Sequence, residues 1–185
     1  IRNLKEKQND ILINQGKILS KINLNEIYKD INDYEFKIFS QFGEDGIIQY
    51  LINNIKIKNK TFVEFGVENY TEANTKFLLE SNNWKGLILD SSKEFIQNIK
   101  NESFYWKFDI VAHHSFINCE NINNILEKNK FTGNVGLLSI DLDGNDYWIW
   151  KSINIIDPDI VIIEYNARFG FKKPITVPYD PKFVR

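Results

Sequence analysis

The chain has 185 residues, of which 43% are hydrophobic, so it can bury the core of one ordinary domain. Its 23 basic and 25 acidic residues leave a formal net charge of -2, and this balance excludes a general nucleic-acid binder. The single cysteine, Cys119, excludes an internal disulfide and favours a reducing, cytoplasmic location. No apolar run could span a bilayer and no signal peptide opens the sequence, so we expect no membrane insertion.

Residues 1–26 predict an amphipathic helix, because no proline interrupts them and Leu4, Ile11 and Ile18 recur every seven residues. The same apolar stripe is widened by Leu12, Leu19 and Ile22. This apolar stripe has two interpretations. It packs on its own domain, or it forms a short coiled coil that joins copies of the protein into a homo-oligomer. Gln8 and Gln15, at seam positions, weigh against the coiled coil. We treat residues 1–38 as an N-terminal helical segment, with a short helix or connector at 23–36, and residues 39–185 as the main domain.

From Phe39 onward, helical patterns alternate with short apolar segments typical of strands. Helices are expected at 44–55, 71–82, 92–102, 117–129 and 147–156. Strands are expected at 61–66, 86–90, 105–111, 136–144 and 159–166. Strand, helix and strand in repeated order predict an α/β fold with a mostly parallel sheet and helices on both faces.

In such sheets, ligands bind outside the carboxyl ends of the strands, and acidic residues lie at several of these predicted ends. The first strand closes with "VEFGVENY", where Gly66 allows a tight turn and Glu64 and Glu68 supply carboxylates. The segment lacks the G-x-G-x-x-G pattern, and its acids would repel a pyrophosphate, so a cationic ligand is favoured over a dinucleotide. The alternative is that Gly66 serves only as a turn residue.

The next two strands are expected to end in Asp90 and Asp109. Asp90 lies about twenty residues after the glycine turn, where an acid can accept the hydroxyls of a ribose. Its alternative role is the N-cap of the following helix, which Ser91 or Ser92 could fill equally well. Asp109 is expected where a base or a ribose would bind.

The segment "SIDLDGNDYWIW" places Asp141 and Asp143 at the end of the fourth strand. Together with Glu164 and Asn166 on the fifth strand, they are hard oxygen ligands suited to Mg²⁺ or another divalent cation. The alternative is a solvated turn that precedes the next helix, and Asp146 is the residue we expect to cap that helix.

Several long blocks in order resemble the FkbM-like family of class I S-adenosylmethionine-dependent methyltransferases, in a bacterial branch that methylates sugars. They cover the chain from Phe39 to its end: "FSQFGEDGII", "FVEFGVEN", "EANTKFLLESNNWKGLILD", "SIDLDGNDYWIWKSI", "VIIEYNARFG" and "TVPYDPKF". The resemblance implies a Rossmann-like catalytic domain that binds S-adenosylmethionine. The positions that match the cofactor pocket of such enzymes are Gln41, Glu64, Gly66, Glu68, Asn74, Asp90, Asp109 and Asp141.

The resemblance also implies a reaction: O-methylation of a sugar, such as a GDP-linked heptose or another nucleotide-activated sugar used for capsular or surface polysaccharide. Asp141, Asp143 and Glu164 are then the catalytic candidates, and Asp143, Glu164 and Asn166 the metal ligands, by analogy with metal-dependent sugar O-methyltransferases. Such enzymes continue after the fifth strand, so we expect the C-terminal part of the sheet to be missing from this sequence.

Two alternative functions fit part of the pattern. "DLD" resembles the D-x-D by which many glycosyltransferases hold a metal and a nucleotide sugar, but that enzyme class leaves the glycine turn without a cofactor to bind. The other alternative is a non-catalytic binding module that oligomerises through its N-terminal helix.

Overall fold

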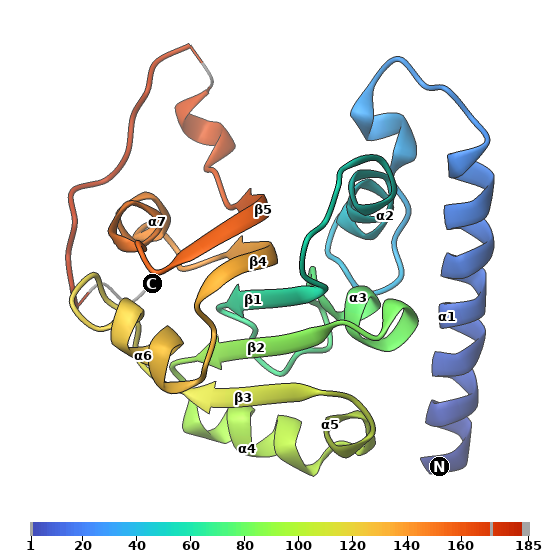
Figure 1. The fold of residues 1–185 in the computed structure, drawn as a ribbon, viewed down its shortest axis with the longest axis horizontal. Helices are drawn as coiled ribbons and strands as arrows, with labels where there is room; N and C mark the ends of the chain where they lie inside the picture. Colours follow the sequence, from blue (N-terminus) through green and yellow to red (C-terminus); the bar gives the residue numbers. More distant parts are fainter. Residues whose placement is uncertain (1, 171, 183–185) are drawn as a thin grey trace.

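A five-stranded, all-parallel sheet runs through the centre of the protein, in the order β3-β2-β1-β4-β5 (Figure 1). The computed structural model describes residues 2–170 and 172–182. The strands are β1 (Thr61–Phe65), β2 (Lys85–Asp90), β3 (Ile110–His114), β4 (Gly133–Ile140) and β5 (Ile156–Ile163). The predicted α/β class and parallel sheet are confirmed, and the arrangement is Rossmann-like.

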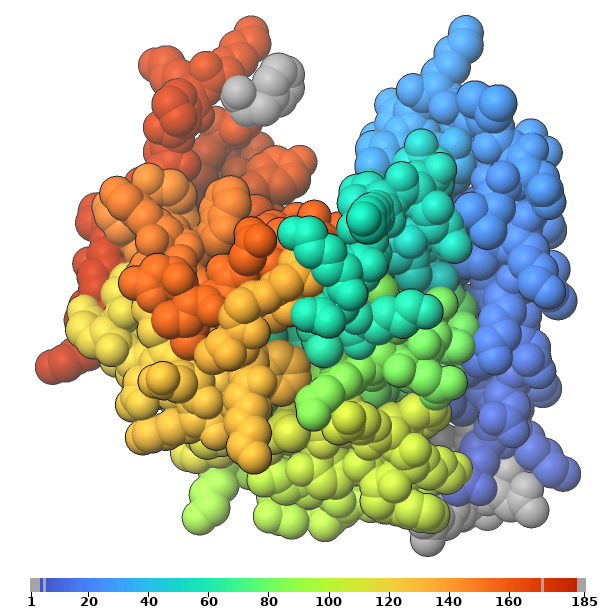
Figure 2. Space-filling model, in the orientation of Figure 1, coloured from blue at the N-terminus to red at the C-terminus, as the bar shows by residue number. Residues whose placement is uncertain are grey.

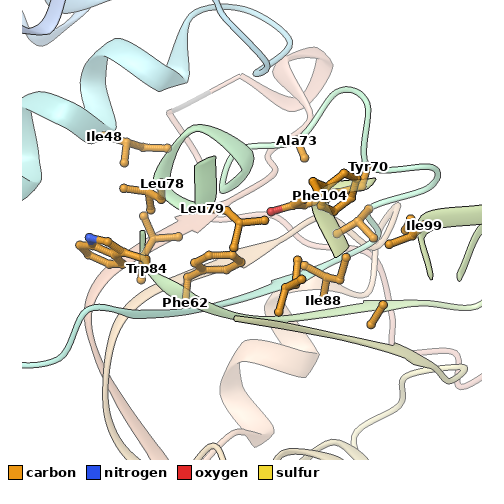
Figure 3. Close-up of a cluster of buried hydrophobic side chains, with 14 of the residues drawn as sticks. Ile48, Phe62, Tyr70, Ala73, Leu78, Leu79, Trp84, Ile88, Ile99 and Phe104 are labelled. Carbon is orange, nitrogen blue, oxygen red and sulfur yellow. The ribbon is translucent and has the colours of Figure 1, made fainter. Parts of the chain in front are cut away.

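Helices cover both faces of this sheet. On one face lie α2 (Glu44–Asn54), α3 (Lys76–Asn82), α4 (Lys93–Asn101) and α5 (Ser103–Lys107), and on the other lie α6 (Ile122–Lys128) and α7 (Asp146–Ser152). Alternate residues of a strand point to opposite faces, so Phe62 packs with α2 and α3 in the cluster of Figure 3, whereas Val63 packs with α6 and α7. Burial on both faces explains why the strands read as nearly continuous apolar runs.

The strand order places the reversal of the sheet between β1 and β4. Phe65, the last residue of β1, pairs with Leu89 of β2 on one side and with Ile140 of β4 on the other. The carboxyl ends of these three strands therefore meet at one edge, which is the position where open α/β sheets bind ligands.

The strand predicted at 105–111 is wrong in its first half. Residues 103–107 form the helix α5, and β3 begins only at Ile110. The aromatic residues of this segment favour a strand locally, but Phe104 is buried instead against Tyr70, with ring centroids 5.7 Å apart. Tertiary packing overrides the local preference here. As a consequence, Asp109 precedes β3 rather than ending it.

The N-terminal helix α1 (Arg2–Leu24) runs along one side of the molecule beside α2 and α3 (Figures 1 and 2). Its domain-facing residues are Ile13 and Gly16, and Gly16 approaches the ring of Phe77 so closely that a Cβ would lie 2.5 Å from it. Leu4, Ile11 and Ile18 of the predicted stripe are exposed, whereas Leu19 of the same stripe is partly buried against the cluster of Ile13, Phe36 and Phe77. The stripe therefore packs on its own domain only along one edge.

Two short 3-10 helices complete the described elements. The connector after α1 contains η1 (Ile31–Tyr34), and η2 (Ala167–Phe169) follows β5. Within residues 2–170 and 172–182, no helix has the length and apolar character that crossing a membrane requires.

Candidate functional site

A cavity of about 1110 Å³ lies at the carboxyl ends of β1, β2, β4 and β5. It brings together most of the residues that the sequence nominates. The predicted residues among its lining are Gln41, Glu64, Gly66, Glu68, Asn74, Asp90, Asp141, Asp143 and Glu164. Cofactor candidates and metal candidates thus share one cavity, on the two sides of the reversal between β1 and β4.

Gly66 begins the turn after β1 and cannot be replaced without movement of the backbone. Its φ is +71°, and a Cβ on this residue would lie 1.8 Å from the carbonyl oxygen of Asp141. Its amide donates a hydrogen bond of 3.0 Å to the carbonyl oxygen of Leu89. The turn therefore joins the ends of three strands.

The residues after Gly66 have an uncommon backbone conformation that neighbouring groups hold in place. Both Glu68 (φ 47°) and Tyr70 (φ 57°) adopt left-handed conformations. Tyr70 is fully buried, and its hydroxyl lies 2.9 Å from Thr75 Oγ1. Strained backbone that is fixed in this way is common at ligand sites.

Asp90, at the end of β2, ties two loops together. Its Oδ2 accepts a hydrogen bond of 2.8 Å from the amide of Glu68, and its Oδ1 accepts one of 2.7 Å from the amide of Ser92. The N-cap of α4 is Ser92, whose hydroxyl accepts from the amide of Phe95, so Asp90 is not needed for that role. Because a carboxylate has about four acceptor positions, Asp90 retains capacity for the hydroxyls of a ligand.

Glu64 is buried, and all of its described hydrogen bonds are to the protein. Its carboxylate accepts from the amide of Asn74 at 2.9 Å, from Thr75 and from the hydroxyl of Ser139 at 3.4 Å. Burial raises its pKa, and these hydrogen bonds oppose the shift. Asn74 also donates from its side chain to the Ser139 hydroxyl at 3.1 Å. Glu64 therefore fixes the floor of the cavity, between β1, β4 and the 74–75 loop.

Asp141, Asp143 and Glu164 form a carboxylate cluster in which one ligand oxygen of each lies within 4.8 Å of the others. Partial burial raises the pKa of Asp141 to about 7, and repulsion from Glu164, Asp146 and Asp143 and a hydrogen bond with Glu164 act in the same direction. Hard oxygen ligands at this spacing suit a divalent cation such as Mg²⁺. A cation would offset the repulsion among them.

The turn that presents Asp143 is stabilised by Asp146, the first residue of α7. One carboxylate oxygen of Asp146 accepts from the amide of Leu142 at 2.7 Å, and the other accepts from the amide of Gly144 at 2.9 Å. Asp143 itself has a φ of 53°, a conformation that Asp and Asn tolerate better than most residues. Asp146 is thus structural, but the N-cap of α7 is Asn145, so the expectation that Asp146 caps this helix is wrong. The turn places Asp143 in the lining of the cavity.

Two of the nominated residues do not reach the cavity. Asp109 lies at the amino end of β3, at the opposite edge of the sheet, where its carboxylate is 3.6 Å from the Nζ of Lys85. The amide oxygen of Asn166 accepts from the amide of Arg168 at 3.0 Å and so caps η2. At the end of β3 the cavity is lined instead by Ser115 and Phe116, which the sequence analysis did not single out.

The loop at 40–43 carries the nominated Gln41, but the contacts that hold the start of this loop were not predicted from the sequence. Asp45 is buried, and one of its oxygens accepts from the amides of Ile38, Phe39 and Ser40 at 2.8, 2.7 and 2.8 Å. Burial raises the pKa of Asp45, and these hydrogen bonds lower it. In the sequence, Asp45 shows only as an acid near a helix N-terminus, with no signal that it binds the preceding loop.

This loop presents an aromatic side chain at the cavity. Glu44, which also lines the cavity, accepts from the amides of Phe42 and Gly43, both at 2.9 Å, and so holds the loop in place. Phe42 is 74% exposed and Tyr165, which follows β5, is 75% exposed, and both line the cavity. Exposed rings beside a polar cavity offer flat surfaces for a ligand.

In comparisons with known proteins, no protein-family model, no curated protein and no solved structure matches the chain. The chemistry of the site therefore rests on its own geometry. One side of the cavity offers a glycine turn and a carboxylate suited to a ribose, and the other side offers three carboxylates suited to a cation or to proton transfer.

Proposed function

We propose that the protein is an S-adenosylmethionine-dependent O-methyltransferase of the FkbM-like family, and that it methylates a hydroxyl of a sugar. The observation that carries the proposal is that the Gly66 turn with Asp90 and the carboxylate cluster with Asp141 line one cavity from opposite sides of the strand reversal. A methyl transfer needs a cofactor site and an acceptor site in contact, because the acceptor oxygen must align with the methyl group.

The cofactor side is formed by the turn after β1 and the end of β2. In this proposal Asp90 accepts hydrogen bonds from the ribose hydroxyls, and Gly66 lets the backbone approach the amino-acid part of the cofactor. Gln41, Glu68 and Asn74 complete this side of the cavity. When bound, S-adenosylmethionine supplies an electrophilic methyl group on a positively charged sulfur, and the acids along the cavity favour that charge.

The acceptor side is formed by the carboxylate cluster. The hydroxyl oxygen of the sugar forms a bond to the methyl carbon, the bond from this carbon to sulfur breaks, and the hydroxyl proton passes to a carboxylate. Asp141 is the residue we assign to accept the proton, because it lines the cavity beside the two proposed cation ligands and its carboxylate can act as a general base. Asp143 and Glu164 would hold a divalent cation, which supplies Lewis-acid polarisation of the hydroxyl when bound.

The proposed acceptor is a nucleotide-activated sugar, such as a GDP-linked heptose or another sugar used for capsular or surface polysaccharide. The exposed rings of Phe42 and Tyr165 support a substrate with a flat face. A cytoplasmic location, expected from the single cysteine, belongs to the same proposal.

Calorimetric titration of S-adenosylhomocysteine tests the cofactor site, and mass spectrometry of nucleotide sugars incubated with S-adenosylmethionine tests the reaction. The expected results are micromolar binding and the gain of one methyl group. Binding of S-adenosylhomocysteine should be independent of Mg²⁺, because the cation candidates lie on the acceptor side of the cavity. A folded protein that binds no S-adenosylhomocysteine contradicts the proposal.

A second candidate is a metal-dependent glycosyltransferase. It is favoured by the fact that both aspartates of the D-x-D segment, Asp141 and Asp143, contribute to the carboxylate cluster. This enzyme would hydrolyse or transfer from a sugar nucleotide without S-adenosylmethionine, and assays with and without that cofactor separate the two functions.

A further inference from the structure

Helix α1 has two apolar faces, and only one of them is used within the domain. On the inner face Ile13 is buried and Gly16 packs against Phe77. The side chain of Asn9 hydrogen bonds to Glu80, and that of Asn23 donates to the carbonyl oxygen of Tyr34 at 2.8 Å. These contacts extend along most of the helix, so α1 cannot rotate to bury its other face.

The outer face carries an apolar stripe with a regular spacing. Four of its residues are largely exposed: Leu4 by 66%, Ile11 by 65%, Ile18 by 59% and Ile22 by 49%. Figures 1 and 2 show α1 at the edge of the molecule, and within the described part of the chain only the inner face meets α2 and α3. Isolated apolar residues are normal on a surface, but a continuous stripe indicates an interaction site.

The spacing of this stripe is that of a coiled-coil seam. Steps of four and three residues alternate without a break through Leu4, Gln8, Ile11, Gln15, Ile18 and Ile22, which we call the outer seam. We infer that the outer seam binds the same seam of a second copy of the protein, in a parallel, in-register coiled coil. The inference is independent of the proposed methyltransferase function.

The two glutamines make the seam less apolar, which weakens a coiled coil, but they also restrict which occupant fits it, and the occupant that fits is a second copy. In a parallel, in-register pair each seam residue faces its own counterpart, so Gln8 meets Gln8 and Gln15 meets Gln15. A glutamine side chain carries both a donor and an acceptor, so two of them can satisfy each other. A lipid surface or an apolar groove would leave these amides without partners, which is costly. Polar seam residues also fix the register of a coiled coil.

The geometry favours two copies over three. Leu19, on one flank of the outer seam, is partly buried against the domain's own apolar cluster of Ile13, Phe36 and Phe77. Because the domain occupies that flank, each helix has room for one neighbour. The outer seam spans only about 27 Å, and isolated helices of this length are marginally stable in water. Here the domain already holds α1 in helical form, so association does not include the unfavourable step of helix formation.

The test is the mass of the protein in solution, measured by sedimentation equilibrium over a range of concentrations. The wild type should sediment with the mass of two chains. The double variant Ile11→Asn/Ile18→Asn should raise the dissociation constant by at least about 100-fold, because it removes four buried isoleucines from each dimer. Its far-UV circular dichroism should match that of the wild type.

The matched control is the double variant Asp10→Asn/Lys17→Asn. It also introduces two asparagines into α1, but at exposed positions outside the outer seam, and it leaves the net charge of the protein unchanged. It should remain dimeric. In a Cys119→Ala background, Gln15→Cys should form a disulfide between copies under mild oxidation, whereas Lys17→Cys should not, since only a parallel, in-register pair brings residue 15 next to itself.

Three results would overturn the inference. The first is a wild-type protein that is monomeric at every concentration. The second is a dimer that the Ile11→Asn/Ile18→Asn variant leaves intact. The third is binding of α1 to lipid vesicles that is lost in that variant while the wild type stays monomeric, which would identify the stripe as a membrane-surface helix instead.

Discussion

Gly66 and Asp141 meet in the lining of the cavity, where a Cβ on Gly66 would lie 1.8 Å from the carbonyl oxygen of Asp141. This contact sets the end of β1 directly against the end of β4. The glycine turn and the carboxylate cluster, which we propose to bind cofactor and acceptor, are therefore fixed relative to each other by the backbone. Alignment of two reacting groups depends on such rigidity.

Gly66→Ala should consequently destabilise the protein strongly. The new methyl group would collide with the carbonyl oxygen in addition to the strain of a positive φ, and we expect the free energy of unfolding to fall by about 3 kcal/mol or more. Gly133→Ala is the matched control, because Gly133 has a φ of +70° but nothing within 4 Å of its Cβ position. It should cost only about 1–2 kcal/mol. Equal losses in urea unfolding would show that the contact with Asp141 is unimportant.

Asp90→Asn should weaken the binding of S-adenosylhomocysteine by about tenfold or more, since charge-assisted hydrogen bonds to hydroxyls are stronger than neutral ones. The same substitution at Asp109, which lies at the other edge of the sheet, should leave the affinity unchanged. Calorimetric titration of both variants measures the difference. A loss of affinity in Asp109→Asn of similar size would contradict the placement of the cofactor.

The stability of the metal-free protein should fall as the pH rises from about 4 to about 7. The pKa of Asp141 is raised from 3.8 to about 7 in the folded state, so between these values the folded protein holds a proton that the unfolded chain has lost. Below this range Asp141 is protonated in both states, and above it Asp141 is charged in both, so its contribution then stays constant. Urea unfolding in steps of pH should show this loss in the wild type.

The variant Asp141→Asn should show a shallower dependence on pH in this window. Asp157→Asn, at an exposed position at the other end of the sheet, should keep the slope of the wild type. If Asp141→Asn and the wild type give the same slope, the carboxylate cluster does not perturb Asp141 in the way described.

A divalent cation should stabilise the folded protein through the carboxylate cluster. At a Mg²⁺ concentration ten times the dissociation constant, the free energy of unfolding should rise by about 1.4 kcal/mol. Asp143→Asn should abolish this gain, and Asn is suitable because it tolerates the φ of 53° at this position. Asp157→Asn should retain it. Stabilisation that survives in Asp143→Asn would place the ion elsewhere.

Phe42→Ala and Tyr165→Ala should each raise the KM for the sugar acceptor by about tenfold, because each removes an exposed ring that lines the cavity. Tyr165→Ala should leave the affinity for S-adenosylhomocysteine unchanged, because Tyr165 follows Glu164 of the carboxylate cluster. Trp106→Ala, which removes another exposed ring (70% exposed) on the distant helix α5, is the control. An unaltered KM in all three variants would remove these rings from the acceptor site.

Much of the fold could be predicted from the sequence because the signals are local. Alternating helical and strand patterns gave the parallel sheet, and a parallel sheet brings the ends of its strands to one edge. Gly66, Asp90, Asp141 and Asp143 could be nominated on this basis, and the structure brings all four to one cavity.

The remaining features were decided by contacts between distant segments. The start of β3 at Ile110, and with it the position of Asp109, depends on the packing of Phe104 against Tyr70. The hydrogen bonds from the amides of residues 38–40 to Asp45 form only because the backbone turns these amides toward the start of α2. No spacing of residues in the sequence indicates this turn. The period of α1 predicts an apolar stripe, but only the tertiary structure shows that Ile13 and Gly16 face the domain and that Leu4, Ile11 and Ile18 face outward. A periodic pattern determines which residues share a face of a helix, whereas the direction of that face depends on which surface packs better.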